Sequence, residues 1–359
     1  MYLCDLRTVG SLKVALLLLQ TAAFNGATLC GIIDLHGYAV RSLSGCENIG
    51  EKMFLTVCLN PTLQKTLRFP SIYPGTVNRT GVHRLDASGK GINVTRVLTQ
   101  LGKKAVHLTQ LGGVLRPLFL SLCEQDGLSV QWVESESQIR FCYTLLSDAD
   151  GSVTELIEES EAVRSGTEER LLEKFDDILA HTADLNWVII SGTKAAGFSD
   201  AVIPSMTRRA KEKGLKVILD IKGKDLMECL KYQPDIVKPN LIEFTADFAP
   251  ELIKNNELIA IDDAAKERIK SAVLDMAKKN KCGVILTNGS RKIIAAEADS
   301  FFEIEVQPVK ALNSTGCGDA FTAGLAAALE DGEVFREAIS NGCKCGALNA
   351  ALVRPGVVR

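Results

Sequence analysis

Apolar residues recur with two different periods along residues 53–359. Short apolar runs typical of buried strands lie at 54–59, 105–111, 187–191, 215–220, 235–237 and 282–287. Stretches with the spacing of amphipathic helices lie at 91–101, 115–126, 167–180, 199–213, 262–280, 317–330 and 333–352. Strands that alternate with helices are typical of a mostly parallel sheet covered by helices. The pattern predicts an α/β fold that binds its ligands at the carboxyl ends of the strands.

Two segments break this alternation, at residues 65–86 and 139–159. Both contain short strand-like runs with polar interruptions, such as Thr66–Phe69 and Phe141–Leu145. We expect them to pair with each other as a small sheet that stands off the core. Such a lid can close over a substrate and exclude water.

The first 52 residues differ from the rest of the chain. An apolar run at Val14–Phe24 follows Arg7 and Lys13, as in the core of a signal peptide, and it is too short to span a bilayer. Met53 then opens a clear strand. We expect residues 1–52 to be a dispensable extension and residues 53–359 to form the functional domain. A targeting peptide at residues 1–52 is the alternative.

Composition limits the classes of function. The chain is 46% hydrophobic and 24% charged, which is typical of a soluble globular protein. Its formal net charge of −3 provides no basic surface for nucleic acid, so phosphate groups must be bound by a few placed cations and backbone amides. The eleven cysteines are scattered and the four histidines lie near no other candidate ligands. We therefore expect reduced thiols, a cytoplasmic location and no zinc site.

The most informative segment is Asn313–Asp319, which reads Asn-Ser-Thr-Gly-Cys-Gly-Asp before an apolar helical pattern. Gly316 and Gly318 allow a tight turn and a close approach to a ligand. The free amides of the first helical turn suit an anion, and Asp319 can act as a base beside it. This arrangement favours transfer of a phosphoryl group to a hydroxyl. An ordinary capped loop is the alternative.

A second glycine-rich segment, Ala87–Val94, opens another helix. It is not a P-loop, because Gly91 follows Lys90 where that motif requires Ser or Thr. Lys90 can still bind a phosphate, and Asn93 can hydrogen-bond sugar hydroxyls. The alternative is a helix start with a solvated lysine.

Two further strand ends carry candidate nucleotide ligands. Asn240 and Glu243, after Lys238-Pro239, have the spacing of a capping box, which is the structural interpretation. The same spacing can direct both side chains to the hydration shell of Mg²⁺. Thr287 and Gly289 end a later strand and suit a nucleotide phosphate. Each motif alone has an ordinary structural explanation, but their order in one α/β chain strongly indicates phosphoryl transfer.

In this order the motifs resemble the ribokinase-like (PfkB) family of carbohydrate kinases, and its 1-phosphofructokinase and tagatose-6-phosphate kinase branch in particular. The resemblance covers nearly all of residues 53–359. It rests on Leu59-Asn60-Pro61, Val77-Asn78-Arg79, 85–93, Arg140, Ser191-Gly192-Thr193, Lys238-Pro239-Asn240, Glu243 and 316–319. It implies a three-layer α/β/α core with a mostly parallel sheet and a small β-sheet lid.

The resemblance also implies a role for each matching residue. Asp319 would take the proton from the accepting hydroxyl, and the backbone of Gly316, Cys317 and Gly318 would form an anion hole. The residues it assigns to a phosphorylated sugar are Gln64, Arg79, Gly89, Lys90, Asn93 and Arg140. Those it assigns to ATP and Mg²⁺ are Lys238, Asn240, Glu243, Thr287, Gly289 and Asn349, with Glu243 on Mg²⁺ through water and Asn349 near the adenine.

Among the departures from the branch, which include Lys194-Ala195-Ala196, two bear on the chemistry. Gln64 replaces the usual Asp, which weakens the hydrogen bond to a sugar hydroxyl. Cys317 replaces the usual Ala and makes sensitivity to oxidants depend on its exposure. The resemblance implies ATP-dependent phosphorylation of fructose 1-phosphate to fructose 1,6-bisphosphate. The alternatives are tagatose-6-phosphate or 6-phosphofructokinase activity, or a non-catalytic sugar-phosphate sensor. The lid has exposed edges, so we expect a homodimer through it.

Overall fold

The main sheet contains nine strands within the part of the chain that the computed structural model describes, residues 52–254, 257–258 and 262–359. Their order is β15-β14-β13-β10-β9-β8-β1-β4-β5. The strands are β1 (Met53–Cys58), β4 (Lys104–Leu111), β5 (Ser129–Glu134), β8 (Leu185–Ser191), β9 (Lys216–Asp220), β10 (Ile236–Val237), β13 (Gly283–Leu286), β14 (Ile293–Glu297) and β15 (Ser300–Ile304). All neighbouring pairs from β13 to β5 are parallel, whereas β14 and β15 are antiparallel.

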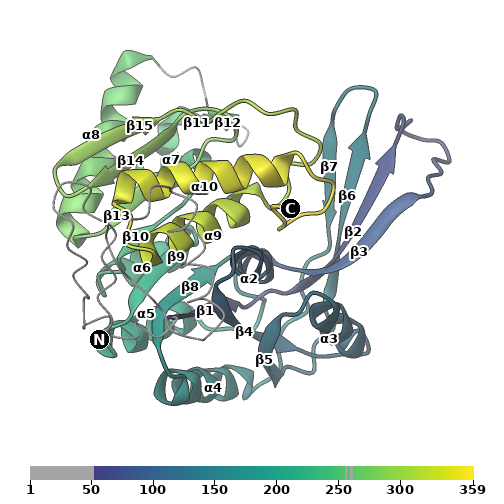
Figure 1. Ribbon diagram of the computed structural model, residues 1–359, viewed down its shortest axis with the longest axis horizontal. Helices are drawn as coiled ribbons and strands as arrows, with labels where there is room; N and C mark the ends of the chain where they lie inside the picture. The colour runs from purple at the N-terminus through teal and green to yellow at the C-terminus, as the bar shows by residue number, and fades with distance from the viewer. Residues whose placement is uncertain (1–51, 255–256, 259–261) are drawn as a thin grey trace, which may run out of the picture. The chain divides into compact units, whose positions relative to one another are not determined.

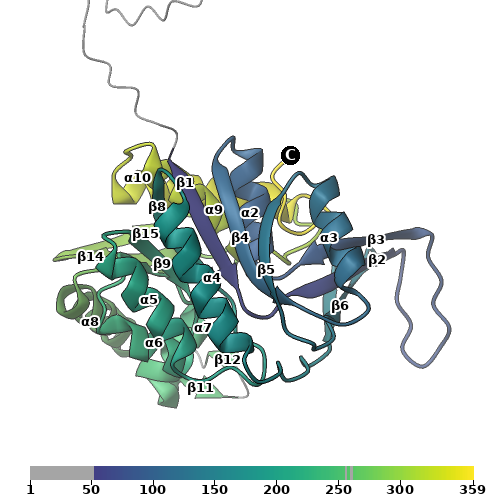
Figure 2. The same cartoon turned by 90° about the horizontal axis from the view of Figure 1, so that it is seen from below.

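Helices cover both faces of this sheet (Figures 1 and 2). One layer consists of α2 (Lys90–Gln100), α9 (Cys317–Glu330) and α10 (Phe335–Ala350). The opposite layer consists of α4 (Thr167–His181), α5 (Val202–Glu212), α6 (Gly223–Leu230), α7 (Leu241–Phe248) and α8 (Asp263–Asn280). α3 (Arg116–Gln125) packs near the base of the lid, and a short segment after α7 holds η2 (Pro250–Leu252), β11 (Ile253–Lys254) and β12 (Glu257–Leu258).

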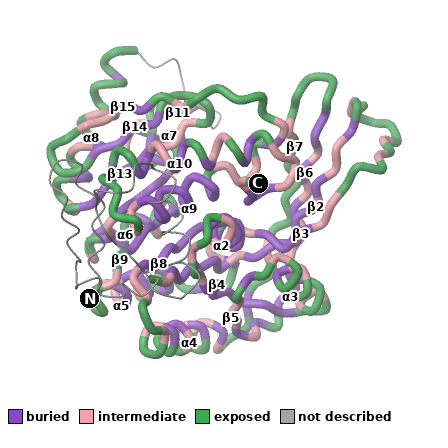
Figure 3. The backbone as a smooth tube through the Cα atoms, viewed as in Figure 1, coloured by how far each residue is buried: buried purple, intermediate pink, exposed green. Residues whose placement is uncertain are grey.

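The central strand β1 shows why its sequence is an unbroken apolar run. Phe54 packs in the apolar cluster that contains α2, α9 and α10, whereas Leu55 and Val57 pack in the cluster that contains α4 and α5. Successive residues of a strand point to opposite faces, so a strand covered on both faces has to be apolar at nearly every position. Figure 3 shows the resulting buried centre of the sheet.

A second sheet of four strands, β3-β2-β6-β7, projects from the core at the right of Figure 1. It consists of β2 (Thr62–Phe69), β3 (Val82–Ser88), β6 (Arg140–Ser147) and β7 (Val153–Ile157). β2 pairs in parallel with β6, so the two segments expected to form a lid do pair with each other. The lid also touches the loop before α9, because the Thr315 hydroxyl donates to Glu155 of β7 at 3.1 Å.

The expected α/β architecture with a small lid sheet is confirmed. The pattern did not predict β5, the β14–β15 hairpin, α6 or α7. The two helices have only eight residues each, which is too short for a helical period to stand out. The expected extension at residues 1–52 lies outside the described residues, except for Lys52. Within the described part of the chain, no helix is long and apolar enough to cross a membrane.

Candidate active site

The segment Asn313–Asp319 forms a tight turn that opens α9. Gly316 is the N-cap of this helix and has a φ of 83°, in the left-handed region that favours glycine. A Cβ atom at Gly316 would lie 2.7 Å from the backbone nitrogen of Gly356, so no larger residue fits without a shift. The amides of the first turn of α9 therefore begin at Cys317, with Asp319 directly behind them.

Asp319 is buried at the carboxyl edge of the sheet, with 6% of its surface exposed. Its Oδ2 accepts a hydrogen bond from the Asn93 amide nitrogen at 2.8 Å. Burial raises the pKa of Asp319 to about 6, and the nearby charge of Asp220 adds to this, whereas Lys90, Asn93 and Lys238 act in the opposite direction. A carboxylate with a pKa close to neutrality can both accept and release a proton.

Asp220 was not among the residues expected from the sequence, although it lies at the centre of the charged cluster. It ends β9 and is almost fully buried. Lys238 lies 3.1 Å from Oδ1 and Lys90 lies 3.7 Å from it, and the Ser191 hydroxyl donates to Oδ2 at 3.0 Å. Burial would raise the pKa of Asp220, but the two lysines outweigh it and hold that pKa below its ordinary value. The sequence signal was an acidic residue directly after a buried strand, Val217–Leu219.

The glycine-rich segment brings Lys90 to the same edge. Gly89 has a φ of 116°, and a Cβ atom there would meet Cys58 Sγ at 3.0 Å. Lys90 then begins α2, and the negative charge of Asp220 is the main cause that raises its pKa above the ordinary value. Lys90 therefore carries a positive charge at every physiological pH.

A cavity of about 170 Å³ lies between the lid and these strand ends. Its lining includes Gly89, Lys90, Arg140, Asp220 and Glu243, together with Cys58, Asn60, Gly192, Thr193, Ile221, Lys222 and Asp225. Two buried polar atoms of this lining, Nε of Arg140 and Oδ1 of Asn60, have no hydrogen-bond partner within the described residues. A free donor and a free acceptor at the cavity suit a phosphate group and a sugar hydroxyl respectively.

Three residues expected at the sugar, Asn93, Arg79 and Gln64, do not line this cavity. Asn93 is buried on α2, where its amide nitrogen donates to Asp319. Arg79 is exposed in the loop between β2 and β3. Gln64 is buried in the lid sheet, where its amide nitrogen donates to the Thr144 hydroxyl at 2.7 Å. The position of Gln64 follows from the register of the paired lid strands, which a sequence pattern does not define.

Lys238 lies next to the first turn of α9. Its side chain is 3% exposed, and a Cβ atom at Gly318 would lie 3.8 Å from its Nζ. Asn240 and Glu243 form the capping box of α7, with the Asn240 side chain accepting from the Glu243 amide at 2.8 Å. The structural interpretation of that spacing is therefore confirmed.

The Glu243 carboxylate also lines the cavity, and its Oε1 lies 3.4 Å from Lys222. No group of three or more His, Cys, Asp or Glu side chains that could hold a metal ion occurs in the described part of the chain. A magnesium ion bound directly by a protein cage does not fit this site. A hydrated Mg²⁺ that meets one carboxylate and substrate phosphates does fit, because Mg²⁺ commonly keeps several waters.

Thr287 and Gly289 follow β13 at the same edge. The Thr287 carbonyl accepts from the Leu241 amide at 2.8 Å, which places this turn beside the start of α7. Gly289 is exposed, with a φ of 57°, and a Cβ atom there would meet nothing within 4 Å. The turn is thus open toward solvent next to Asn240.

Asn349 does not have the environment expected for an adenine contact, because it is fully buried. Its amide nitrogen donates to the Thr315 carbonyl at 2.9 Å, and its oxygen accepts from the Gly356 amide at 2.7 Å. Asn349 therefore ties the end of the chain to the turn before α9. Burial raises the pKa of the neighbouring Cys317 thiol, which keeps it protonated and slow to react with oxidants.

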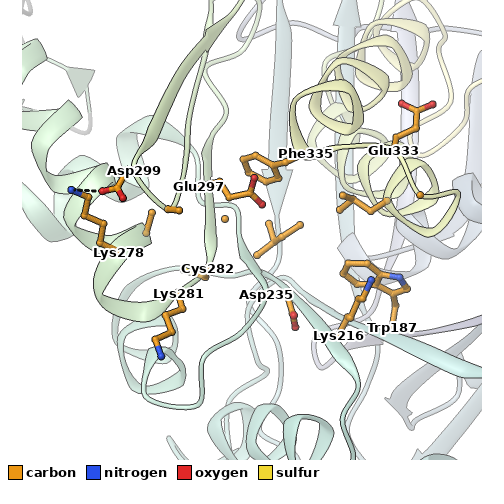
Figure 4. A pocket seen from close by; sticks show the side chains of 16 residues that line it. Trp187, Lys216, Asp235, Lys278, Lys281, Cys282, Glu297, Asp299, Glu333 and Phe335 are labelled. Carbon is orange, nitrogen blue, oxygen red and sulfur yellow. Dashed lines mark ion pairs between the residues drawn. The ribbon is translucent and has the colours of Figure 1, made fainter.

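A larger hollow of about 850 Å³ lies at the opposite edge of the sheet, by the amino ends of β9, β10 and β13 (Figure 4). The Lys216 ammonium lies 4.9 Å from the centre of the Trp187 ring, and Lys278 pairs with Asp299 at 2.7 Å. The positive charges of its lysines and the negative charges of its carboxylates largely cancel. We assign it no role in catalysis, because it is remote from Asp319 and the first turn of α9.

Comparison with solved structures places this architecture among known folds. Phosphofructokinase-2 from Escherichia coli, in complex with substrates and products, aligns with a TM-score of 0.73 and 21% identity over 84% of this chain and 93% of that chain. A protein from Thermotoga maritima described as a possible 1-phosphofructokinase aligns with a TM-score of 0.73 and 20% identity over the same shares, 84% and 93%. The tetrameric inhibited form of the Escherichia coli phosphofructokinase-2 gives 0.70 and 21%, over 83% and 94%.

At these identities the likeness shows the ribokinase-like fold. The family follows from the sequence itself, because a family model described as "pfkB family carbohydrate kinase" matches residues 55–353. That range contains the glycine loop at Lys90, the Asn240/Glu243 pair and the Gly316–Asp319 turn. The chain therefore belongs to the pfkB family of carbohydrate kinases, which transfer a phosphoryl group to a sugar hydroxyl.

Proposed function

We propose that the protein phosphorylates fructose 1-phosphate at its 6-hydroxyl with ATP and releases fructose 1,6-bisphosphate. The observation that carries this proposal is the pair of cations at the small cavity, Lys90 and Arg140, with Nε of Arg140 unpartnered within the described residues. Lys90 already lies 3.7 Å from Asp220, but a neutral sugar would leave Nε of Arg140 without a charged partner. A sugar that already bears a phosphate group would pair with them.

The proposed chemistry needs few groups. The sugar hydroxyl loses its proton to Asp319, its oxygen forms a bond to the γ-phosphorus of ATP, and the bond from that phosphorus to ADP breaks. The amides of the Gly316–Gly318 turn and the positive end of α9 stabilise the charge on the transferring group. Lys238 adds a positive charge beside them. Bound Mg²⁺ would neutralise phosphate charge, and Glu243 would hold it through water.

Two alternatives remain with this site. Lys90 and Arg140 suit a phosphate group on any ketohexose, so tagatose 6-phosphate and fructose 6-phosphate are competing acceptors. Gln64 in place of the usual aspartate favours a second alternative, a sensor that binds sugar phosphate without turnover. The buried, pKa-shifted Asp319 argues for turnover.

A substrate panel tests the proposal. ADP release is measured with ATP, Mg²⁺ and, in turn, fructose 1-phosphate, tagatose 6-phosphate, fructose 6-phosphate and fructose. We expect the highest kcat/KM with fructose 1-phosphate and the lowest with fructose, because only the latter lacks the phosphate that pairs with Lys90 and Arg140. A preference for fructose 6-phosphate or tagatose 6-phosphate would replace our choice of acceptor. Thermal stabilisation by sugar phosphate with no ADP release would establish a sensor.

We also propose that two copies of the chain associate through the lid. The edge strand β7 carries two exposed apolar side chains, Leu156 at 53% and Ile157 at 56%, and Val82 is exposed on the opposite edge strand β3. Unpaired apolar edge strands favour association with another strand, and copies of one chain commonly pair about a two-fold axis.

Sedimentation of the Ile157→Lys variant tests this association. We expect the wild-type protein to sediment as a dimer and the variant as a monomer, because the charge would be buried between two lids. Val114→Lys is the matched control, since Val114 is 84% exposed outside the lid. A monomeric wild-type protein, or equal effects of both substitutions, would contradict the lid interface.

A further inference from the structure

Arg96 is an arginine buried inside the domain, one turn after Asn93 on α2. Its side chain is 2% exposed. A buried guanidinium is costly unless its donors all meet acceptors. Here Nε lies 2.8 Å from Asp126, Nη1 donates to the Asn93 oxygen at 2.9 Å, and Nη2 donates to the Ala87 carbonyl.

The contact with Asn93 decides how its amide is oriented. The two ends of an asparagine amide have nearly the same shape, so shape alone does not select which end faces Asp319. An ionised Asp319 only accepts and so selects the Asn93 nitrogen, whereas a protonated Asp319 can donate and leaves the orientation open. Arginine has only donors, so the atom that faces Arg96 must be the Asn93 oxygen in both protonation states of Asp319. The Ser88 hydroxyl also donates to that oxygen at 3.2 Å, but a hydroxyl can accept as well and cannot select the orientation by itself. The Asn93 nitrogen is then left to donate to Asp319.

We propose that Arg96 is a positioning residue that orients the Asn93 amide so that it donates to Oδ2 of Asp319. This inference rests on the proposal that Asp319 is the base. With Oδ2 held by Asn93, the proton of the sugar hydroxyl goes to Oδ1, which has no hydrogen-bond partner in the described part of the chain. Arg96 acts on the reaction only through Asn93.

Arg354, near the end of the chain, stabilises the carboxylate that pairs with Arg96. Arg354 pairs with Asp126 and also with Asp86 of β3. Burial would raise the pKa of Asp126, but Arg354 and Arg96 together hold it below its ordinary value. Asp126 is therefore a fixed anion that holds the Arg96 guanidinium against Asn93.

The hydrogen bond from Asn93 favours the charged form of Asp319. The other charged or titratable groups near Asp319 are Lys90 from α2, Asp220 at the end of β9, Lys238 after β10, Cys58 at the end of β1 and Cys317 from the first turn of α9. None of these contacts Arg96 in the network described above. Loss of the fixed amide orientation should therefore raise the pKa of Asp319 without changing those neighbours.

The test is a direct titration of Asp319 in the free, full-length protein labelled with [¹³Cγ]aspartate, where the Asp319→Asn spectrum identifies the signal. In Arg96→Met we expect the pKa of Asp319 to rise by about one unit, the scale of one hydrogen bond to a charged group. Arg84→Met is the matched control, because Arg84 pairs with Asp86 in the same cluster but does not contact Asn93. We expect it to leave the titration of Asp319 unchanged.

If Arg96→Met does not fold, Arg96→Gln replaces it. Glutamine can still pair with the Ala87 carbonyl, but its amide carries both donor and acceptor and no longer selects the orientation of Asn93. A rise of the Asp319 pKa in the folded Arg96 variant, absent in Arg84→Met, supports the proposal. No rise, or an equal rise in both, overturns it. The titration needs no substrate, so a wrong choice of acceptor sugar does not affect its result.

Discussion

Replacing Asp319 with asparagine is expected to lower kcat by about 10²–10⁴-fold, the usual contribution of a well-placed general base. Asparagine has nearly the same shape and can still meet Asn93, but it cannot take the proton of the sugar hydroxyl. KM for both substrates should change little, because Asp319 is buried in the first turn of α9 and does not line the cavity with Lys90 and Arg140. Steady-state assays of ADP release measure both constants.

Asp331→Asn is the matched control, because Asp331 follows the last turn of α9 and its side chain is 61% exposed. It should keep the wild-type kcat. An Asp319→Asn variant that retained most of its kcat would show that another group takes the proton.

The wild-type pH profile provides a second measure of the same base. The pKa of Asp319 is raised to about 6, and only the deprotonated carboxylate accepts a proton. We therefore expect kcat/KM to be level above that pH and to fall below it. A substrate phosphate group also titrates at about pH 6. The direct titration of Asp319 in the free protein decides between these two groups. If the pKa of the fall in kcat/KM equals the directly measured pKa of Asp319, the fall is assigned to Asp319.

Replacing Asp220 with asparagine has the largest expected effect on stability. The buried Lys238 would lose its carboxylate partner, and breaking a buried ion pair from one side typically costs about 3–5 kcal/mol. We expect the free energy of unfolding, measured by denaturant titration, to fall by that amount. The exposed pair partner Lys90 should contribute little to the loss, because its side chain is 45% exposed.

The control for this experiment is Asp200→Asn. Asp200 pairs with Lys224 and Lys194, but its side chain is 58% exposed, and exposed pairs contribute only about 0–1 kcal/mol. Equal losses of stability in the two variants would show that Asp220 is not the central anion of a buried cluster. The Asp220 variant that remains folded should also titrate Asp319 at a lower pH, because the charge of Asp220 raises that pKa.

Most elements of the fold could be predicted from local pattern. The run at 54–59 corresponds to β1, and the helical spacing at 317–330 corresponds to α9 residue for residue. Pairing of the two lid segments was predicted as well. The antiparallel β14–β15 hairpin was not predicted, because an edge pair with partly exposed residues has no continuous apolar run.

The backbone geometry of the candidate site could be predicted where a glycine closely precedes the residue that carries the chemistry. Gly316 before Asp319 and Gly89 before Lys90 are such motifs, since a left-handed glycine and the helix start that follows are set within a few residues. Asn349 carries no comparable local information. Its two amide ends meet Thr315 and Gly356, so the chain end packs on the turn before α9.

The sequence by itself determined the α/β class, the lid segments and the Gly316–Asp319 turn, because each depends on residues close together in the chain. The phosphoryl-transfer chemistry followed from the order of several such motifs along the chain. Only the tertiary structure decided that Asp220 joins Lys90 to Lys238, that Arg96 orients Asn93 toward Asp319, and that Arg79 lies away from the cavity. Most of those contacts join residues that are far apart in sequence. The others depend on which way a side chain points in the folded protein. Burial, pairing and hydrogen-bond direction exist only once the strands and helices have packed.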